Sequence, residues 1–355
     1  MTKVNGWVDI HSHFTPPTTL QERQAQWHGL REACFLAPRP YHWQPETTLA
    51  TMDRLGIAMQ MLSPVPLAPT VPELRAWNDY GARLVADHPG RFGLLAGLPT
   101  DDPAECLAEI ERGDTQTHPD GYLLTTNRNG VPLSDPRLAP VWAELDRRQA
   151  VLFVHPRTDI APPLGQPAAL LEVAFETARA ITDLLYTGFL HRYPGLTMVL
   201  AHCGGALPAL SGRVGLLGAE PWVPNPAGMT SADIRADLAR LYLDTAASGT
   251  DANLAAAVTM VPRDHLVYGA DAGVPCSDEA SMARNIEALH GSAVLGPEEV
   301  DRLGRRAFDL FPAAARRHRV TSRLRRPSRT AAGTTRRQRG NGHRQRSAAW
   351  GGVNT

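Results

Sequence analysis

The chain has 355 residues, 43% of them hydrophobic, which is enough to bury the core of one large α/β domain or of two ordinary ones. Its formal net charge of zero hides an asymmetry, because residues 316–355 contain 12 arginines and no acidic residue. Removing these 12 from the 36 basic residues leaves 24 against 36 acidic ones. The body of the chain is therefore acidic, and nucleic acid is not its expected partner.

Membrane insertion and export are not expected either. No uninterrupted apolar run is long enough to span a bilayer, and residues 1–9 lack the basic and apolar regions of a signal peptide. The four cysteines have no short paired spacing, which argues against a disulfide framework or a thiolate metal site. We therefore expect a soluble, cytoplasmic protein.

Short apolar runs alternate with longer amphipathic stretches, as is typical of repeated βα units and a parallel sheet. The predicted strands, in chain order, are residues 7–11, 58–63, 92–98, 122–126, 151–155, 198–202, 242–245 and 266–269. The predicted helices are residues 72–88, 104–112, 137–148, 168–191, 252–260, 279–290 and 297–311.

Residues 137–148 illustrate the helical pattern. Leu138, Val141, Trp142 and Leu145 recur at the spacing of one buried helical stripe, and the Asp-Pro pair before them is a typical helix start. Eight strands alternating with such helices over about 310 residues predict a closed (β/α)8 TIM barrel. An open, doubly wound sheet would need a glycine-rich phosphate turn after an early strand, and none is present.

Two segments depart from the βα pattern. Residues 14–45 show no clear period and are predicted to be an insertion after the first strand that covers the barrel mouth. The arginine-rich segment 316–355 could bind nucleic acid, but without interleaved aromatic residues we favour a disordered tail. The predicted division is therefore a barrel over residues 1–315 and a tail over residues 316–355.

The first strand carries the clearest chemical signal, a His-x-His pair. Residues i and i+2 of a strand point to the same side, so His11 and His13 can present two imidazoles to one point. His155, His202 and Asp271 each follow a predicted strand, and the carboxyl ends of barrel strands open on one face. Buried imidazoles and a carboxylate need partners, and a metal ion serves several of them together.

The motifs HSH, FVHP, LAHCGGALP and YGAD resemble those of the amidohydrolase superfamily, in particular its decarboxylase branch related to aminocarboxymuconate-semialdehyde decarboxylase. The similarity extends over residues 7–312, and several stretches are most similar to 6-methylsalicylate decarboxylase-like members. The resemblance implies that His11, His13, His155 and Asp271 are metal ligands. It also implies that His202 is a nearby acid/base and that Arg213 holds the substrate carboxylate in a neighbouring subunit's site, hence a homodimer.

One divalent metal ion is expected, with Zn2+ favoured over Mn2+. Two-metal relatives use a carboxylated lysine on the fourth strand, whereas the only lysine here is Lys3. After Asp271 the chain reads Ala-Gly-Val-Pro instead of the aromatic residue and proline common in the family, which leaves the substrate open. Asp244, after the seventh strand, could orient a ligand histidine or cap a turn.

The expected activity is non-oxidative decarboxylation of an aromatic or dienyl carboxylic acid, such as an ortho-hydroxybenzoate, with Asp271 and His202 handling protons. The alternative is a hydrolase, a lactonase or amidohydrolase, on the same scaffold, because a metal with an open position can also activate water. Carbon dioxide release would distinguish the two. The expected partner is therefore a small carboxylic acid.

Overall fold

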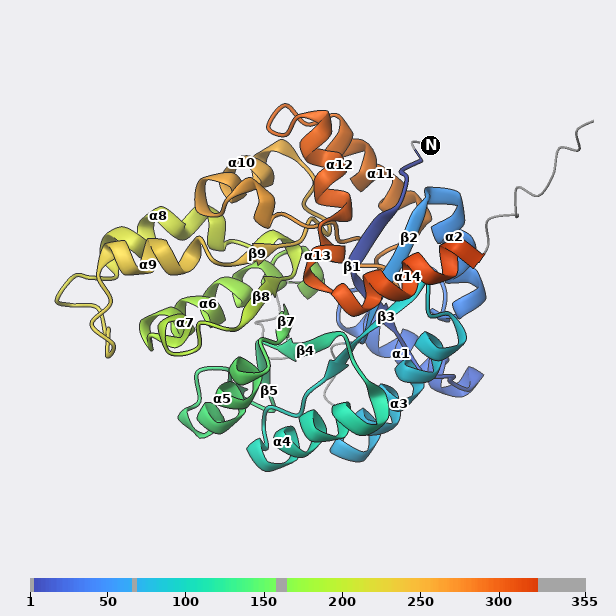
Figure 1. The fold of residues 1–355 in the computed structure, drawn as a ribbon, viewed down its shortest axis with the longest axis horizontal. Coiled ribbons are helices and arrows are strands. Elements are labelled where there is room, and N and C mark those ends of the chain that lie inside the picture. The colour runs from blue at the N-terminus through green and yellow to red at the C-terminus, as the bar shows by residue number, and fades with distance from the viewer. Residues whose placement is uncertain (1–2, 66–68, 158–164, 325–355) are drawn as a thin grey trace, which may run out of the picture.

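The computed structural model describes residues 3–65, 69–157 and 165–324. Seven parallel strands pair in the order β1-β2-β3-β4-β7-β8-β9. They are β1 (Trp7–Phe14), β2 (Ile57–Pro64), β3 (Phe92–Gly97), β4 (Gly121–Thr125), β7 (Val151–His155), β8 (Thr197–Leu200) and β9 (Tyr242–Leu243). The strands curl around a common centre with the helices outside them (Figure 1). The first seven predicted strands are thus confirmed.

The eighth predicted strand, residues 266–269, is not a regular strand. It makes one isolated parallel bridge, between Leu266 and Leu243 of β9, and a second bridge joins Ala272 to Ser12 of β1. Backbone bonds still link the segment to both edge strands, from Val267 N–H to the Leu243 carbonyl (2.9 Å) and from Ile10 N–H to the Tyr268 carbonyl (3.0 Å). The eighth predicted strand is therefore present only as these bridges and bonds, which link β9 to β1, and the backbone turns left-handed just after it, at Asp271 with φ of 53°.

The helices predicted from apolar periodicity are present, with boundaries shifted by a few residues and with two of them, residues 168–191 and 297–311, each split in two. The described helices are α1 (Leu20–Glu32), α2 (Pro45–Leu55), α3 (Val71–Asp87), α4 (Pro103–Arg112), α5 (Ala139–Arg147), α6 (Glu172–Tyr186), α7 (Phe189–Arg192), α8 (Leu207–Leu217), α9 (Ser231–Leu238), α10 (Asp251–Met260), α11 (Glu279–His290), α12 (Pro297–Arg305), α13 (Ala307–Leu310) and α14 (Pro312–Leu324). A short antiparallel pair, β5 (Asn127–Arg128) and β6 (Val131–Pro132), follows β4.

Alternate strand residues divide the core into two layers, as the period of two requires. A smaller cluster draws on six of the seven strands and on residues 266–269, the bridging segment, and fills the inside of the curl. It includes Val8, Ile10, Met59, Met61, Leu95, Leu123, Phe153, Val199 and Val267. Phe311 and Ala314 close this cluster from the C-terminal helices. The larger cluster packs the other strand faces against the helices. A filled interior leaves the carboxyl ends of the strands as the place for chemistry.

Both segments that depart from the βα pattern, residues 14–45 and the chain after residue 316, contain helical structure. The insertion contains α1, which begins at a capping box between Thr19 and Glu22 and buries none of its residues. Helix α14 continues past residue 316, where the tail was expected to begin, and the Arg317 guanidinium donates to the Asp120 carboxylate at 2.7 and 3.1 Å. The remaining part of the predicted tail, residues 325–355, lies outside the described residues.

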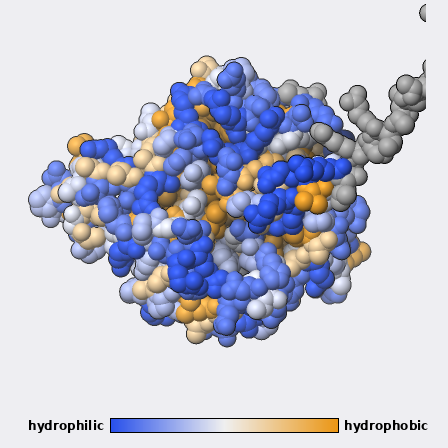
Figure 2. All heavy atoms as spheres, viewed as in Figure 1, coloured by the Kyte–Doolittle hydropathy of each residue, from blue (hydrophilic) through white to orange (hydrophobic). Residues whose placement is uncertain are grey.

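The face of the molecule seen in Figure 2 is mainly polar. Hydrophilic residues dominate the face seen in Figure 2, and hydrophobic ones form small groups between them. Among the described residues, no helix combines the length and apolar character needed to cross a membrane. All four cysteines are free thiols, as expected.

Candidate metal centre

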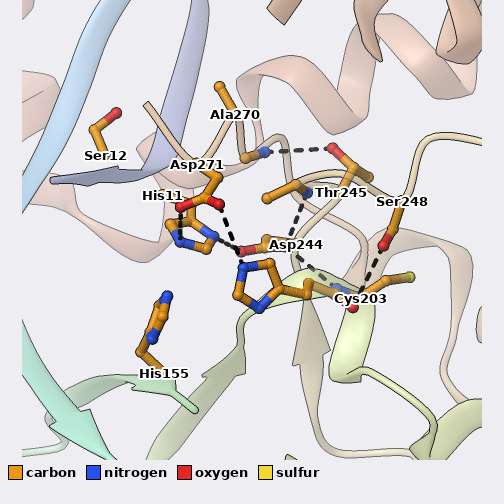
Figure 3. A network of polar contacts seen from close by, with 12 residues as sticks. His11, Ser12, His155, Cys203, Asp244, Thr245, Ser248, Ala270 and Asp271 are labelled. Carbon is orange, nitrogen blue, oxygen red and sulfur yellow. Dashed lines mark hydrogen bonds and ion pairs between the residues drawn. The ribbon is translucent and has the colours of Figure 1, made fainter. Parts of the chain in front are cut away.

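Four predicted ligands meet at the carboxyl ends of the strands. His11 and His13 come from β1, His155 ends β7, and Asp271 follows the bridging segment. One ligand atom from each residue lies within 4.8 Å of the others. His11 and His13 are completely buried, and His155 is 7% exposed. Figure 3 shows His11, His155 and Asp271 pointing into a shared space.

The Nδ1 atom of each imidazole already has a partner on the outer side. His11 Nδ1–H donates to the Asp244 carboxylate (2.7 Å), and His155 Nδ1–H donates to the Pro156 carbonyl (2.9 Å). His13 Nδ1 is bonded to the Ser63 hydroxyl (3.0 Å). Since a carboxylate and a carbonyl only accept, they leave the Nε2 lone pairs free to face the centre, which is the usual outer arrangement of metal-binding histidines.

The inner nitrogen and oxygen atoms of the four residues lie close together. His11 Nε2 lies 3.1 Å from both His13 Nε2 and Asp271 Oδ1, and His13 Nε2 lies 3.5 Å from the same carboxylate oxygen. Several lone pairs converging at such distances repel one another unless a cation lies among them. Three imidazole nitrogens and one carboxylate oxygen suit a divalent transition-metal ion, so the residues present fit the expected metal.

The charge distribution of the metal-free centre is uneven. Burial disfavours a charged imidazole, but the charges of Asp244 and Asp271 outweigh it and raise the pKa of His11 to about 10. Burial lowers the pKa of His13, and burial with the neighbouring imidazoles lowers that of His155 well below its ordinary value. Burial favours a neutral Asp271 carboxyl, yet the adjacent histidines hold its pKa well below the ordinary value. One proton, on His11, therefore occupies the centre at neutral pH.

Metal binding is accordingly expected to release about one proton per chain at pH 8. Below its pKa of about 10, His11 is protonated in the metal-free protein, so the metal must displace that proton. The apparent affinity should rise about tenfold per pH unit as pH increases towards 10 and then level off. Titration calorimetry of the metal-free protein in two buffers of different ionisation enthalpy measures the released protons. A value near zero at pH 8 would contradict this charge distribution.

His202 lies beside the four ligands without belonging to them. Its Nε2 is 3.6 Å from Asp271 Oδ2, and its side chain is 12% exposed. Its Nδ1 is buried and has no hydrogen-bond partner among the described residues. A histidine that touches the ligand carboxylate and is partly open to solvent is placed to move protons, which is the role expected for it.

The structure also places Arg213 and Asp244, which the sequence analysis named, and Ser63, which it did not. Arg213 is exposed on α8 and makes no ion pair or hydrogen bond within the described part of this chain, so it does not join the centre of its own chain. Asp244 was expected either to orient a ligand histidine or to cap a turn, and it makes both contacts. It accepts from His11 Nδ1–H and also from Ala246 N–H (3.0 Å) in a turn. Ser63 was not predicted, since a serine at a strand end carries no distinctive signal.

A family model described as amidohydrolase matches residues 8–312. The chain belongs to this amidohydrolase family. The resemblance drawn from the four motifs is thereby confirmed, and the match covers the whole sheet, the centre and the helices up to α13.

Curated relatives within the family are decarboxylases. Decarboxylase yanB of Aspergillus niger is 30% identical over 335 residues, covering 86% of this chain and 87% of the relative. The 6-methylsalicylic acid decarboxylase of Penicillium expansum is 28% identical over 321 residues, covering 86% of this chain and 96% of the relative.

A solved structure supports the family fold. The 5-carboxyvanillate decarboxylase of Novosphingobium aromaticivorans, complexed with manganese and 4-hydroxy-3-methoxy-5-nitrobenzoic acid, aligns with a TM-score of 0.71. The alignment covers 87% of this chain and 96% of that chain, at 18% sequence identity. At this identity the likeness concerns the fold alone, which this chain shares with that decarboxylase.

Proposed function

We propose that this chain is a carboxy-lyase, a metal-dependent enzyme that decarboxylates an aromatic or dienyl carboxylic acid without oxidation. The observation that carries the proposal is the buried group of three histidines and one aspartate within 4.8 Å, with His202 at its edge. The decarboxylase relatives support the reaction type. An ortho-hydroxybenzoate is the substrate class we favour, since one relative is named for 6-methylsalicylic acid, which belongs to that class.

His11, His13, His155 and Asp271 would hold one divalent ion. A bound ion would act as a Lewis acid and stabilise the negative charge that develops on substrate oxygen. Zn2+ remains the candidate suggested by the nitrogen-rich ligand set. Mn2+ is an equal candidate, because the structurally similar 5-carboxyvanillate decarboxylase was solved with manganese.

The protein groups account for the proton that the reaction consumes. The bond between the ring carbon and the carboxylate breaks, carbon dioxide leaves, and the electron pair stays on the ring carbon. Because Asp271 is ionised, the proton would come from solvent through His202, pass from its Nε2 to Asp271 Oδ2, 3.6 Å away, and go on to that carbon, which leaves Asp271 ionised again. The six-strand interior cluster and the buried histidines keep bulk water from one side of the centre.

We also propose that the active form is a closed (β/α)8 barrel assembled as a homodimer, in which Arg213 holds the substrate carboxylate in the partner's site. Arg213 is exposed on α8, and the same region exposes Leu216 (69%) and Trp222 (67%). Large apolar side chains this exposed are typical of a surface that another chain covers. A guanidinium supplied across such an interface would fix a carboxylate through two parallel hydrogen bonds.

Arg213→Ala is expected to raise KM for the carboxylate about 10- to 100-fold, the cost of losing a charge-assisted hydrogen bond. Arg284→Ala, an equally exposed arginine on α11, is the matched control and should leave KM unchanged. Mixing Arg213→Ala chains with His202→Asn chains tests the partner contribution. A 1:1 mixture should recover about one quarter of the wild-type activity, because about half of its dimers are mixed and one of the two sites in each mixed dimer has both residues. No recovery would place Arg213 in the site of its own chain.

The test of the proposed activity is product analysis. The metal-loaded protein is incubated with ortho-hydroxybenzoates, including 6-methylsalicylate, and carbon dioxide and the decarboxylated phenol are measured. Equal amounts of both products support the carboxy-lyase. Release of a ring-opened or hydrolysed acid from lactone or amide substrates, without carbon dioxide from any benzoate, would replace it with the hydrolase alternative.

A further inference from the structure

Asp244 follows β9 and connects two parts of the centre. The residue is completely buried. Its Oδ2 accepts from His11 Nδ1–H (2.7 Å), while its Oδ1 accepts from Cys203 N–H (3.3 Å) and from Ala246 N–H (3.0 Å). Figure 3 shows Asp244 between His11 and Cys203, with dashed lines to both sides. One carboxylate thus contacts a metal ligand and the backbone next to His202.

The turn that carries His202 is strained. His202 and Cys203 both have left-handed backbones, with φ of 53° and 58°. Each non-glycine residue in this region costs of the order of 1 kcal/mol or more, so surrounding contacts must hold it there. The His202 side chain does not anchor the turn through Nδ1, which has no partner among the described residues. Two other side chains support the turn: Asp244 accepts from Cys203 N–H (3.3 Å), and the Ser248 hydroxyl donates to the His202 carbonyl at the longer distance of 3.5 Å.

Gly269 allows Asp244 and His11 to approach each other. A Cβ atom at Gly269 would lie 3.0 Å from both Cβ and Cγ of Asp244, and 3.0 Å from Cβ of His11. Real Cβ atoms rarely come so close to their neighbours, so a larger residue would push the two side chains aside. The glycine in the bridging segment thus leaves room for the carboxylate beside the ligand.

We propose that Asp244 is a positioning residue that sets His11 and His202 relative to one another. One oxygen holds His11 in the tautomer that presents Nε2 to the metal, and the other holds the left-handed turn that places the His202 ring. The metal and the proton-transfer group therefore depend on a single buried carboxylate. The inference rests on the proposed function for the role of His202, whereas its effect on His11 requires only that the centre binds a metal.

Asp244→Asn separates the two contacts. The amide oxygen can still accept from Cys203 and Ala246, and in that orientation the amide nitrogen, a donor, faces His11 Nδ1–H. The variant should fold, but the Kd for Zn2+ should rise about 10- to 100-fold, as is usual when the outer partner of a ligand histidine is lost. In the Zn2+-loaded, 15N-histidine-labelled protein, the hydrogen-bonded His11 Nδ1–H resonance should move upfield. Asp244→Ala loses both contacts and, at full metal occupancy, should show a lower kcat than Asp244→Asn with KM unchanged.

Asp237→Asn is the matched control. Asp237 is also buried and accepts from a histidine, His191 Nδ1 (3.0 Å), but on α9 away from the centre. The Asp237→Asn variant should have a lower free energy of unfolding than wild type and an unchanged Zn2+ affinity.

Folded Asp244→Asn protein with wild-type Kd for Zn2+ and an unmoved His11 resonance would overturn the proposal. Equal kcat in both Asp244 variants at full occupancy would overturn the link to His202. Wild-type protein that binds Zn2+ but releases no carbon dioxide would instead refute the decarboxylase, and the Kd and resonance would still decide the role of Asp244.

Discussion

Replacing His202 with asparagine is expected to lower kcat for carbon dioxide release by about 10²- to 10⁴-fold, the usual contribution of a general acid or base. The imidazole contacts Asp271 but is not one of the four ligands, so the metal content should not change. Asparagine tolerates the left-handed backbone at this position better than most residues, which keeps the turn intact. Steady-state kinetics and elemental analysis on the same preparation measure both quantities.

His118→Asn is the control for this substitution. His118 also has a left-handed backbone, with φ of 43°, but it is exposed and remote from the centre. It should have wild-type kcat and metal content. A His202→Asn enzyme with kcat within a factor of about three of wild type would show that protons reach the substrate carbon by another route.

The second large effect is expected for Asp271→Asn. The metal Kd should rise at least about 100-fold and activity should fall by about 10³-fold or more, since the change removes a ligand charge and the carboxylate that would pass the proton from His202 to the substrate. The neighbouring histidines keep this carboxyl ionised in spite of its burial, so the neutral amide also removes the partner that His11 and His13 share. A chelator competition assay and carbon dioxide release measure the two effects.

Asp264→Asn is the control. It changes an exposed aspartate at the other end of the bridging segment and should alter neither the metal Kd nor the activity. An Asp271→Asn protein that keeps a full complement of metal would remove Asp271 from the ligand set. Retained metal with lost activity would leave Asp271 only as the proton donor.

The regular part of the fold was predictable because burial leaves a simple pattern. The apolar runs of β1 to β4, β7 and β8 and the stripe formed by Leu138, Val141, Trp142 and Leu145 identify strands and helices without tertiary information. Helix α1 was missed because none of its residues is buried, so it has no apolar face to detect. Helix α8 was missed for a different reason: its sequence, LPALSGRVGLL, is apolar on most sides and contains two helix-weakening glycines.

The inner part of the site was also predictable, because a histidine or aspartate at the end of a strand has a known direction. His11, His13, His155 and Asp271 were named from that argument with the family motifs, and the structure brings them together. The outer partners were not predictable. The Pro156 carbonyl is backbone, and the Ser63 hydroxyl and both oxygens of Asp244 depend on contacts between segments far apart in the chain.

The arginine-rich C-terminal segment and the substrate show a further limit of prediction from sequence. Helix α14 extends beyond residue 316 because Arg317 pairs with Asp120, nearly 200 residues earlier, and composition alone cannot reveal such a contact. Substrate choice depends on side-chain shape around the centre, and the segment that follows His155 in the sequence includes residues 158–164, which lie outside the described ranges. Family motifs therefore identify the reaction class more readily than the acid that reacts.

The most direct test of the account is the metal content of the purified protein, measured by elemental analysis for wild type, His11→Ala and Asp271→Ala. The predicted result is about one zinc or manganese ion per wild-type chain, lost in both variants while circular dichroism shows that they remain folded. A folded wild-type protein that contains no metal, and takes up none after reconstitution with Zn2+ or Mn2+, would contradict the proposed metal centre.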